Sequence, residues 1–213
     1  MAAYDLEEQE QIAEFKAWWA QYGSLVVTML LALALGFAGW QGWNWYRNAR
    51  VAEASALYSD LQQAAAAGNA QQIREIVGKL TDKHGDTVHA QLGTLLSAGV
   101  QFQNKDLDRA RSQLEWAADK GKDVVLRDLA RLRLAAVLMQ QGAADEALAR
   151  LQPVPEGALR ARFEDLRGDV LASQGKTAEA RTAWQAAAGA LGSAASESSL
   201  RLTIRAKLES LEG

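Results

Sequence analysis

The chain contains no cysteine among its 213 residues. Disulfide bonds, thiolate metal sites and cysteine nucleophiles are therefore excluded. The absence leaves the cellular compartment open, because proteins without disulfides occur on both sides of a membrane. Histidine is almost as scarce: His84 and His89 are the only two, and they lie on either side of Gly85. Two histidines five residues apart across a helix break do not share one helical face, so we predict no metal site.

Catalytic motifs are missing as well. The sequence has no Gly-x-Ser-x-Gly nucleophile elbow. Gly175-Lys176-Thr177 matches the end of a phosphate-binding P-loop, but the motif also needs a glycine five residues earlier, where this chain has Val170. We therefore predict no catalytic residues, no cofactor and no small-molecule substrate, and hence a protein that is not an enzyme.

Proline and blocks of positive charge are also lacking. The two prolines, Pro153 and Pro155, fall in one short segment, and Gly, Asn and Asp punctuate the rest at intervals that are typical of helices joined by short turns. From Arg47 onward basic and acidic side chains nearly balance, which argues against a nucleic-acid partner. The sequence therefore predicts an all-α protein that binds no nucleic acid.

One long apolar stretch is present, and it is the most informative part of the chain. Residues 17–46 carry no charged side chain. From Tyr22 to Trp40 a helix would rise about 27 Å, close to the hydrocarbon thickness of about 30 Å in a bilayer. Aromatic residues, which favour the headgroup level, gather at both ends of the stretch: Trp18, Trp19 and Tyr22, then Trp40, Trp43, Trp45 and Tyr46. We predict one membrane-spanning helix over residues 23–46.

Two alternatives to a permanent anchor were weighed. A cleaved signal peptide has a basic start and a small-residue cleavage site, whereas the preceding segment here is acidic and aromatic residues end the apolar run. A buried core helix of a soluble domain rarely runs thirty residues without a charge. The anchor also carries small residues on one face, which favours close contact with another helix in lipid, although glycine is common in membrane helices in general. The predicted membrane face consists of Ala32, Gly36, Gly39 and Trp40.

The segment after the anchor contains an internal repeat. A turn residue recurs at Gly68, Lys105, Gly142 and Gly175, with spacings of 37, 37 and 33. A small or apolar residue follows five positions later in each unit, at Ile73, Ala110, Ala147 and Ala180, and another apolar residue follows four positions after that, at Val77, Leu114, Leu151 and Trp184. This spacing predicts pairs of antiparallel helices that stack into a solenoid, because one pair cannot bury its apolar face alone.

The repeat fixes the expected helices and domains. We predict about three to four helix pairs and a C-terminal capping helix whose inner face is apolar. The parts are a tail of residues 1–22, the transmembrane helix of residues 23–46 and a repeat domain of residues 47–213. The helices are expected at 47–67, 70–83, 86–103, 106–119, 123–141, 144–151, 158–174, 177–191 and 199–211. The sequence leaves open whether the first of them continues directly from the membrane helix.

Two groups of apolar residues in the repeats have a structural and a functional interpretation. Trp116 and Trp184 lie in second helices, where core packing between repeats is the favoured interpretation. Four residues of first helices occupy positions that commonly line the concave groove of stacked helix pairs: Leu95, Phe102, Leu132 and Met139. They are either core or an adaptable groove for extended chains or a partner's segment.

The chain resembles two known groups of proteins. The Gly-x-x-x-x-Ala spacing at Gly142–Ala147 and at Gly175–Ala180 looks like tetratricopeptide repeats. The N-terminal arrangement is similar to the YfgM family along the whole chain, carried by Tyr4–Gln9, Lys16–Trp19, Tyr22–Gly23 and Gly39–Trp40. That resemblance implies an ancillary subunit of the SecYEG translocon in the inner membrane of Gram-negative bacteria, with no enzymatic activity.

The resemblance also implies topology and partners. It implies a cytoplasmic N-terminal tail, one membrane pass and a periplasmic repeat domain, with SecYEG and the membrane-anchored periplasmic chaperone PpiD as partners. The positive-inside rule does not decide the orientation, because Arg47 and Arg50 follow the helix while Lys16 and the terminal amine precede it. The expected function is a scaffold that helps translocated proteins pass to a periplasmic chaperone. The alternative is a membrane-anchored regulator that sequesters a stress-response signalling protein.

Overall fold

The computed structural model describes residues 3–192 and 198–211, and every element within those ranges is helical. This confirms the predicted all-α class, and the helices of the repeat region end within two residues of the predicted limits. The elements are α1 (Ala3–Ala66), α2 (Ala70–His84), α3 (Val88–Gln103), α4 (Leu107–Lys120), α5 (Val124–Gln140), α6 (Ala144–Arg150), the 3-10 turn η1 (Gly157–Leu159), α7 (Arg160–Ser173), α8 (Thr177–Ala190) and α9 (Ser198–Glu209).

Helix α1 answers the question of continuity that the sequence left open. The tail, the apolar stretch and the first repeat helix form one helix, Ala3–Ala66, with no break at Tyr22 or Arg47. No proline and no turn sequence interrupts this segment, so nothing ends the helix before Gly68. By internal contacts the chain divides into two units, Met1–Arg50 and Val51–Gly213.

The first unit exposes its apolar side chains. Leu33, Leu35 and Phe37 are 65%, 74% and 64% exposed, and no other described part of the chain covers them. Within the described residues this is the one helix long and apolar enough to cross a membrane. Its exposure argues against the core helix of a soluble domain, whose apolar side chains would be buried by the protein itself.

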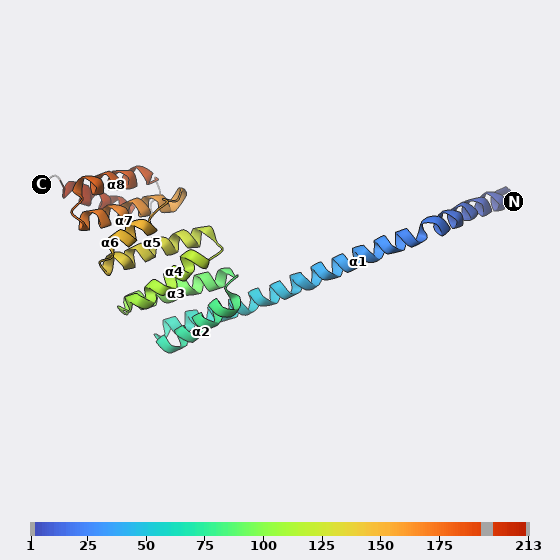
Figure 1. The fold of residues 1–213 in the computed structure, drawn as a ribbon, viewed down its shortest axis with the longest axis horizontal. Coiled ribbons are helices and arrows are strands. Elements are labelled where there is room, and N and C mark those ends of the chain that lie inside the picture. Colours follow the sequence, from blue (N-terminus) through green and yellow to red (C-terminus); the bar gives the residue numbers. More distant parts are fainter. Residues whose placement is uncertain (1–2, 193–197, 212–213) are drawn as a thin grey trace. The chain divides into compact units, whose positions relative to one another are not determined.

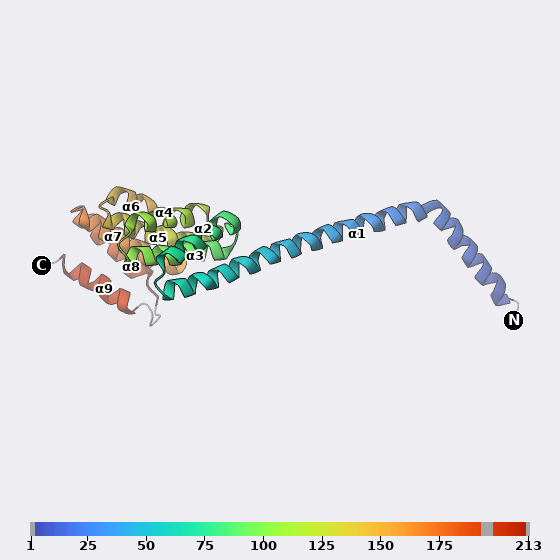
Figure 2. The same ribbon diagram turned by 90° about the horizontal axis from the view of Figure 1, so that it is seen from below.

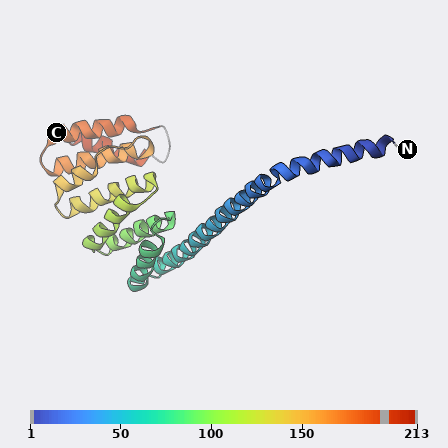
Figure 3. The ribbon, with the colours of Figure 1, turned by 45° about the vertical axis from the view of Figure 1, so that its right-hand side comes forward.

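The second unit is a stack of antiparallel helix pairs. The last part of α1 pairs with α2, then α3 with α4, α5 with α6 and α7 with α8, and α9 packs on α8. Figures 1 and 3 show successive pairs following one another like steps from α2 to α8. Three apolar clusters run through the stack: the first includes Leu61 and Leu80, the second Leu134 and Phe163, and the third Leu171 and Trp184. Trp116 contacts the first and second of them, and Leu148 contacts the second and third, so the core is continuous between neighbouring pairs.

The four predicted turn residues share one backbone conformation. Gly68, Lys105, Gly142 and Gly175 have φ angles of 66°, 65°, 78° and 75°. The residue after each turn donates its N–H to a carbonyl five residues back, for example Asn69 to Ala64 at 3.0 Å. This is the Schellman arrangement, in which a left-handed residue closes the helix end. Glycine adopts it freely, whereas Lys105 carries the steric cost of its Cβ.

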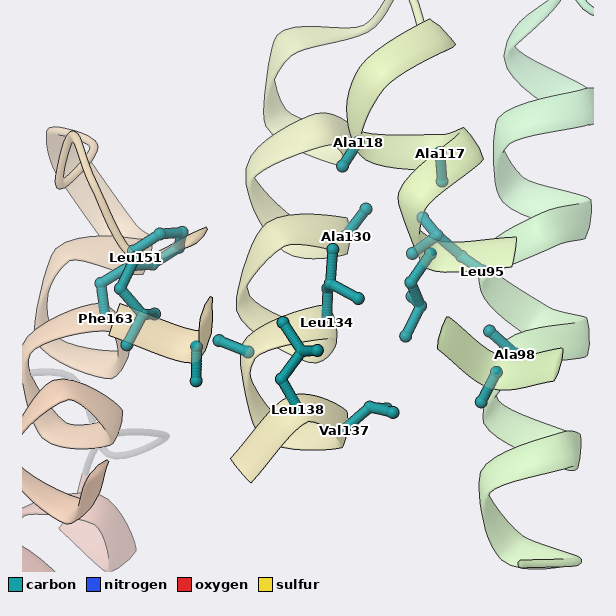
Figure 4. Packing of buried hydrophobic residues seen from close by; sticks show 14 of the residues in the cluster. Leu95, Ala98, Ala117, Ala118, Ala130, Leu134, Val137, Leu138, Leu151 and Phe163 are labelled. Carbon is teal, nitrogen blue, oxygen red and sulfur yellow. The ribbon is translucent and has the colours of Figure 1, made fainter. Parts of the chain in front are cut away.

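The predicted contact residues are all buried. Ile73, Ala110, Ala147 and Ala180 are fully buried, and Val77, Leu114, Leu151 and Trp184 are at most 5% exposed. The small residues allow the two helices of a pair to approach closely, and the larger ones fill the space between pairs. Figure 4 shows that helix α5 has buried side chains on two sides. Val137 points toward Ala98, and Leu138 points toward the side of Phe163. The interpretation of Trp184 as core is confirmed, since it is 5% exposed within the third cluster.

Helix α9, visible in Figure 2, is the predicted cap. Its Ile204 is buried, and Lys207 reaches α7, where its Nζ lies 2.7 Å from Asp165 Oδ1 and 2.6 Å from Asp169 Oδ1. Asp169 also accepts a hydrogen bond of 3.1 Å from Trp184 Nε1. This cluster fixes the cap to the last helix pair through a partly buried ion pair.

Ionisation of this cluster follows from its burial. Burial raises the pKa of the Asp165 carboxyl, and the hydrogen bond from Lys207 only partly offsets that effect. Burial also acts to lower the pKa of Lys207, but the hydrogen bonds to Asp165 and Asp169 outweigh it and raise that pKa above its ordinary 10.5. The contribution of charged Lys207 to stability is therefore present below pH 10.5 and is lost as the pH rises through the folded-state pKa.

We predict that Lys105→Gly stabilises the repeat domain. Glycine removes the left-handed strain of a side-chain-bearing residue, which is worth about 1 kcal/mol. The measurement is the thermal midpoint of the intact protein in detergent, followed by its helical circular dichroism. Gly175→Lys is the mirror-image control and should lower the midpoint by a similar amount, because no neighbouring atom would contact its Cβ and only the backbone cost remains. A lower thermal midpoint for Lys105→Gly would show that the left-handed backbone at Lys105 does not destabilise the domain.

Candidate partner-binding groove

An apolar hollow of about 520 Å³ lies between α3 and α5, with Leu114 of α4 contributing to its lining. Its walls come mainly from α3 and α5, the first helices of two successive pairs, where the sequence predicts a groove. The principal lining residues are Leu95, Leu96, Val100 and Phe102 from α3 and Arg133, Ala136 and Val137 from α5.

The hollow exists because two facing positions are small. Gly99 of α3 and Ala136 of α5 both line it, and they are 37 residues apart, so they occupy equivalent places in successive repeats. A Cβ added at Gly99 would meet no atom within 4 Å. The glycine is therefore not required by packing, and its missing side chain leaves open space.

The hollow has one charged side chain in its lining. Arg133 is the one charged side chain among the residues that line the hollow, and its Nη1 donates a hydrogen bond of 3.3 Å to the carbonyl oxygen of Leu95. The sequence of α3 contains no Asp, Glu, Lys or Arg. An apolar hollow beside one guanidinium suits an extended apolar segment that offers a carbonyl or carboxylate oxygen.

The four predicted groove residues separate into two pairs. Leu95 is 3% exposed and Phe102 is 36% exposed, and both line the hollow. Leu132 and Met139 do not line it; they are partly buried against a core cluster that also contains Leu95. Binding by any of the four remains a prediction.

Sequence reasoning missed several lining residues. Leu96, Val100, Arg133, Ala136 and Val137 line the hollow but were not among the candidates. A usable signal was present, because Leu96 and Arg133, like Val100 and Val137, are 37 residues apart. Comparing equivalent positions of neighbouring repeats would have identified both walls of the same interval.

The predicted membrane face is exposed along α1. Ala32, Gly36, Gly39 and Trp40 all have exposed positions, and a Cβ at Gly36 or Gly39 would meet no atom within 4 Å. The chain itself therefore leaves room for another helix there. Contact with a second helix at this face remains a prediction.

The chain is similar in sequence to known proteins. The chain matches the family described as Tetratricopeptide repeat-like domain over residues 16–213. A Neisseria gonorrhoeae protein named ancillary SecYEG translocon subunit is 32% identical over 84% of this chain and 86% of its own length. Proteins of the same name from Aggregatibacter actinomycetemcomitans and Escherichia coli are 32% and 30% identical, over 89% and 84% of this chain and 94% and 86% of their own lengths.

We predict opposite effects of alanine at two glycines of α3. Gly99→Ala should raise the free energy of unfolding by about 0.5–1 kcal/mol, because alanine stabilises a helix interior and the added methyl group enters open space. Gly93→Ala should instead destabilise by about 1–3 kcal/mol, because its Cβ would lie 2.7 Å from Leu80 Cδ1 and 3.2 Å from Leu61 Cδ2. Thermal unfolding of both variants in the same detergent checks the pair. Equal destabilisation would mean that the space beside Gly99 is filled in solution.

Proposed function

Because this chain belongs to the family of ancillary SecYEG translocon subunits, we propose that it is a single-pass inner-membrane protein that accompanies the SecYEG translocon. In this proposal it catalyses no reaction. Its repeat domain binds a periplasmic chaperone related to PpiD, or a client chain, and helps hand over translocated proteins. The observation that carries the proposal is similarity over more than four fifths of the chain to proteins of that name, in a molecule with one apolar helix and stacked helix pairs.

Tethering supports a recruitment role. A domain held at the bilayer by one helix samples a small volume next to the membrane, which raises its effective concentration for chains that emerge there. Modest contacts then suffice for binding, since the local concentration replaces part of the affinity. The exposed small face at Gly36 and Gly39 is our candidate for contact with a helix of the translocon.

The hollow between α3 and α5 supports binding of an extended segment. Its apolar lining accepts side chains of varied shape, and Arg133 can hold a carbonyl or carboxylate oxygen of the bound chain. Phe102, which is 36% exposed at the rim, is positioned as the anchor residue of such a contact.

The proposed orientation places the tail in the cytoplasm and the repeat domain in the periplasm. Alkaline phosphatase folds and is active only where disulfides form, so a fusion after Gly213 should be active and a fusion before Met1 inactive. The measurement is phosphatase activity in intact cells at matched expression. Activity of the N-terminal fusion alone would reverse the orientation.

The functional proposal predicts a selective loss in Phe102→Asp. The intact protein, purified in mild detergent, should retain SecYEG but bind the chaperone or client roughly tenfold more weakly, equivalent to about 1.4 kcal/mol. Leu202→Asp is the matched control, because Leu202 is an exposed apolar residue of α9 and should leave binding unchanged. Quantitative identification of the co-eluting chains gives the readout.

The same preparation distinguishes the proposed scaffold from the alternative, a membrane-anchored regulator. If residues 1–16 are deleted and translocon association persists while a stress response is lost, the protein acts as an anchored regulator. If no translocase component and no folding factor co-elutes with the unaltered protein, the proposed function is wrong.

A further inference from the structure

The repeat domain exposes few large apolar side chains, and most of them gather in one place. Among the described residues from 51 onward, six such side chains are exposed. Phe102 belongs to the groove and Leu202 to α9. The other four form what we call the valine edge: Val51, Val88, Val124 and Val125, with exposed fractions of 40%, 45%, 57% and 66%.

The repeat places these valines along a single edge. Val51, Val88 and Val125 are 37 residues apart, so they occupy the same position in three successive repeats. Val88 begins α3, Val124 begins α5, and Val51 is the first residue of the repeat unit. Figures 1 and 3 show the turns before α3, α5 and α7 following one side of the stack, and the turns before α2, α4, α6 and α8 following the other.

Packing does not account for the valine edge. None of its four residues belongs to an apolar cluster of the core, and valine is a weaker helix former than alanine. Helices that begin at the opposite edge start with Ala70, Leu107, Ala144 and Thr177, and Leu107 packs against the core. Exposed apolar side chains gathered on one side of a domain mark a surface that contacts something else.

Chain length identifies the neighbour. The outer aromatic belt of the anchor ends at Tyr46, five residues before Val51. Even a fully extended chain of five residues spans at most about 18 Å, so the start of the valine edge cannot lie far from the bilayer surface. A surface held this close to lipid by the covalent chain meets headgroups before any other partner.

The charges beside Val124 and Val125 fit a lipid surface. Lys120 and Lys122 are exposed in the turn before Val124. The acidic residues of that turn are engaged: Asp119 pairs with Arg150 at 2.9 Å, and Asp123 accepts a hydrogen bond of 2.9 Å from the N–H of Leu126. Lysines can lay their apolar stems along the bilayer interface and place their ammonium groups among anionic headgroups.

We propose that the valine edge rests in the headgroup region of the membrane that holds the anchor. The contact gives the repeat stack a second attachment besides α1 and limits how it turns about the anchor, so the groove between α3 and α5 keeps a defined direction relative to the bilayer. The inference depends on the anchor crossing the membrane and is independent of any association with the translocon.

Absence of cysteine makes the test direct. The full chain is reconstituted in nanodiscs of phosphatidylethanolamine and phosphatidylglycerol that contain a nitroxide-labelled lipid, with no other protein present. A fluorophore is attached to a single cysteine at Val125→Cys, the second residue of α5. The matched control is Ala178→Cys, the exposed second residue of α8, at the opposite edge.

The proposal predicts that lipid nitroxide quenches the label at position 125 several-fold more strongly than the label at position 178, because apolar groups of an interfacial surface lie about 5–10 Å into the headgroup boundary. Adding Val88→Asp and Val124→Asp should bring the quenching at position 125 close to that at position 178. Unchanged helical circular dichroism shows that these variants are folded.

Two results would overturn the proposal. If the labels at positions 125 and 178 are quenched equally without the two aspartate substitutions, the valine edge does not lie at the lipid. Protection of position 125 only after other membrane proteins are added would assign the edge to a protein partner instead.

Discussion

The whole repeat domain depends on one packing constraint: a pair of helices cannot bury its apolar face without the next pair. In each unit a left-handed turn residue reverses the chain, and a fully buried small or apolar residue five positions later lets the second helix return against the first. The face that remains uncovered is then closed by the following pair, and finally by α9. Because each unit contacts mainly its neighbours, stability accumulates along the stack, and the terminal cap is as necessary as any internal pair.

The same constraint creates the surfaces available for binding. Where facing first helices carry large side chains, the interval is filled; where they carry Gly99 and Ala136, it is hollow. Where helices begin, residues of the first turn lie outside the core, and their exposure follows the repeat. The groove and the valine edge thus arise from positions that stacking leaves unused, which explains how one simple scaffold can present two different apolar surfaces.

Much of this architecture could be predicted from the sequence, because its signals are local. The four turn positions, the buried residues that follow them and the role of Trp184 depend on spacing within one unit, and all were confirmed. The groove was predicted only in part. Leu95 and Phe102 line the hollow while Leu132 and Met139 do not, and that distinction depends on how the neighbouring helices pack. The sequence left open whether the helix continues through Arg47, because the composition changes there. The structure has one continuous helix, since no residue ends it.

The sequence by itself determined the long apolar helix, the approximate number of helix pairs and the turn chemistry, since an uncharged run of thirty residues and a repeated backbone conformation are properties of consecutive residues. Tertiary structure alone decided which apolar residues became core, which line a hollow and which lie exposed at an edge. It also decided that Lys207 would pair with Asp165, forty-two positions away in the chain. The physical reason is that burial depends on what the rest of the chain places beside a residue, and apolar residues of the same kind serve equally well in all three settings.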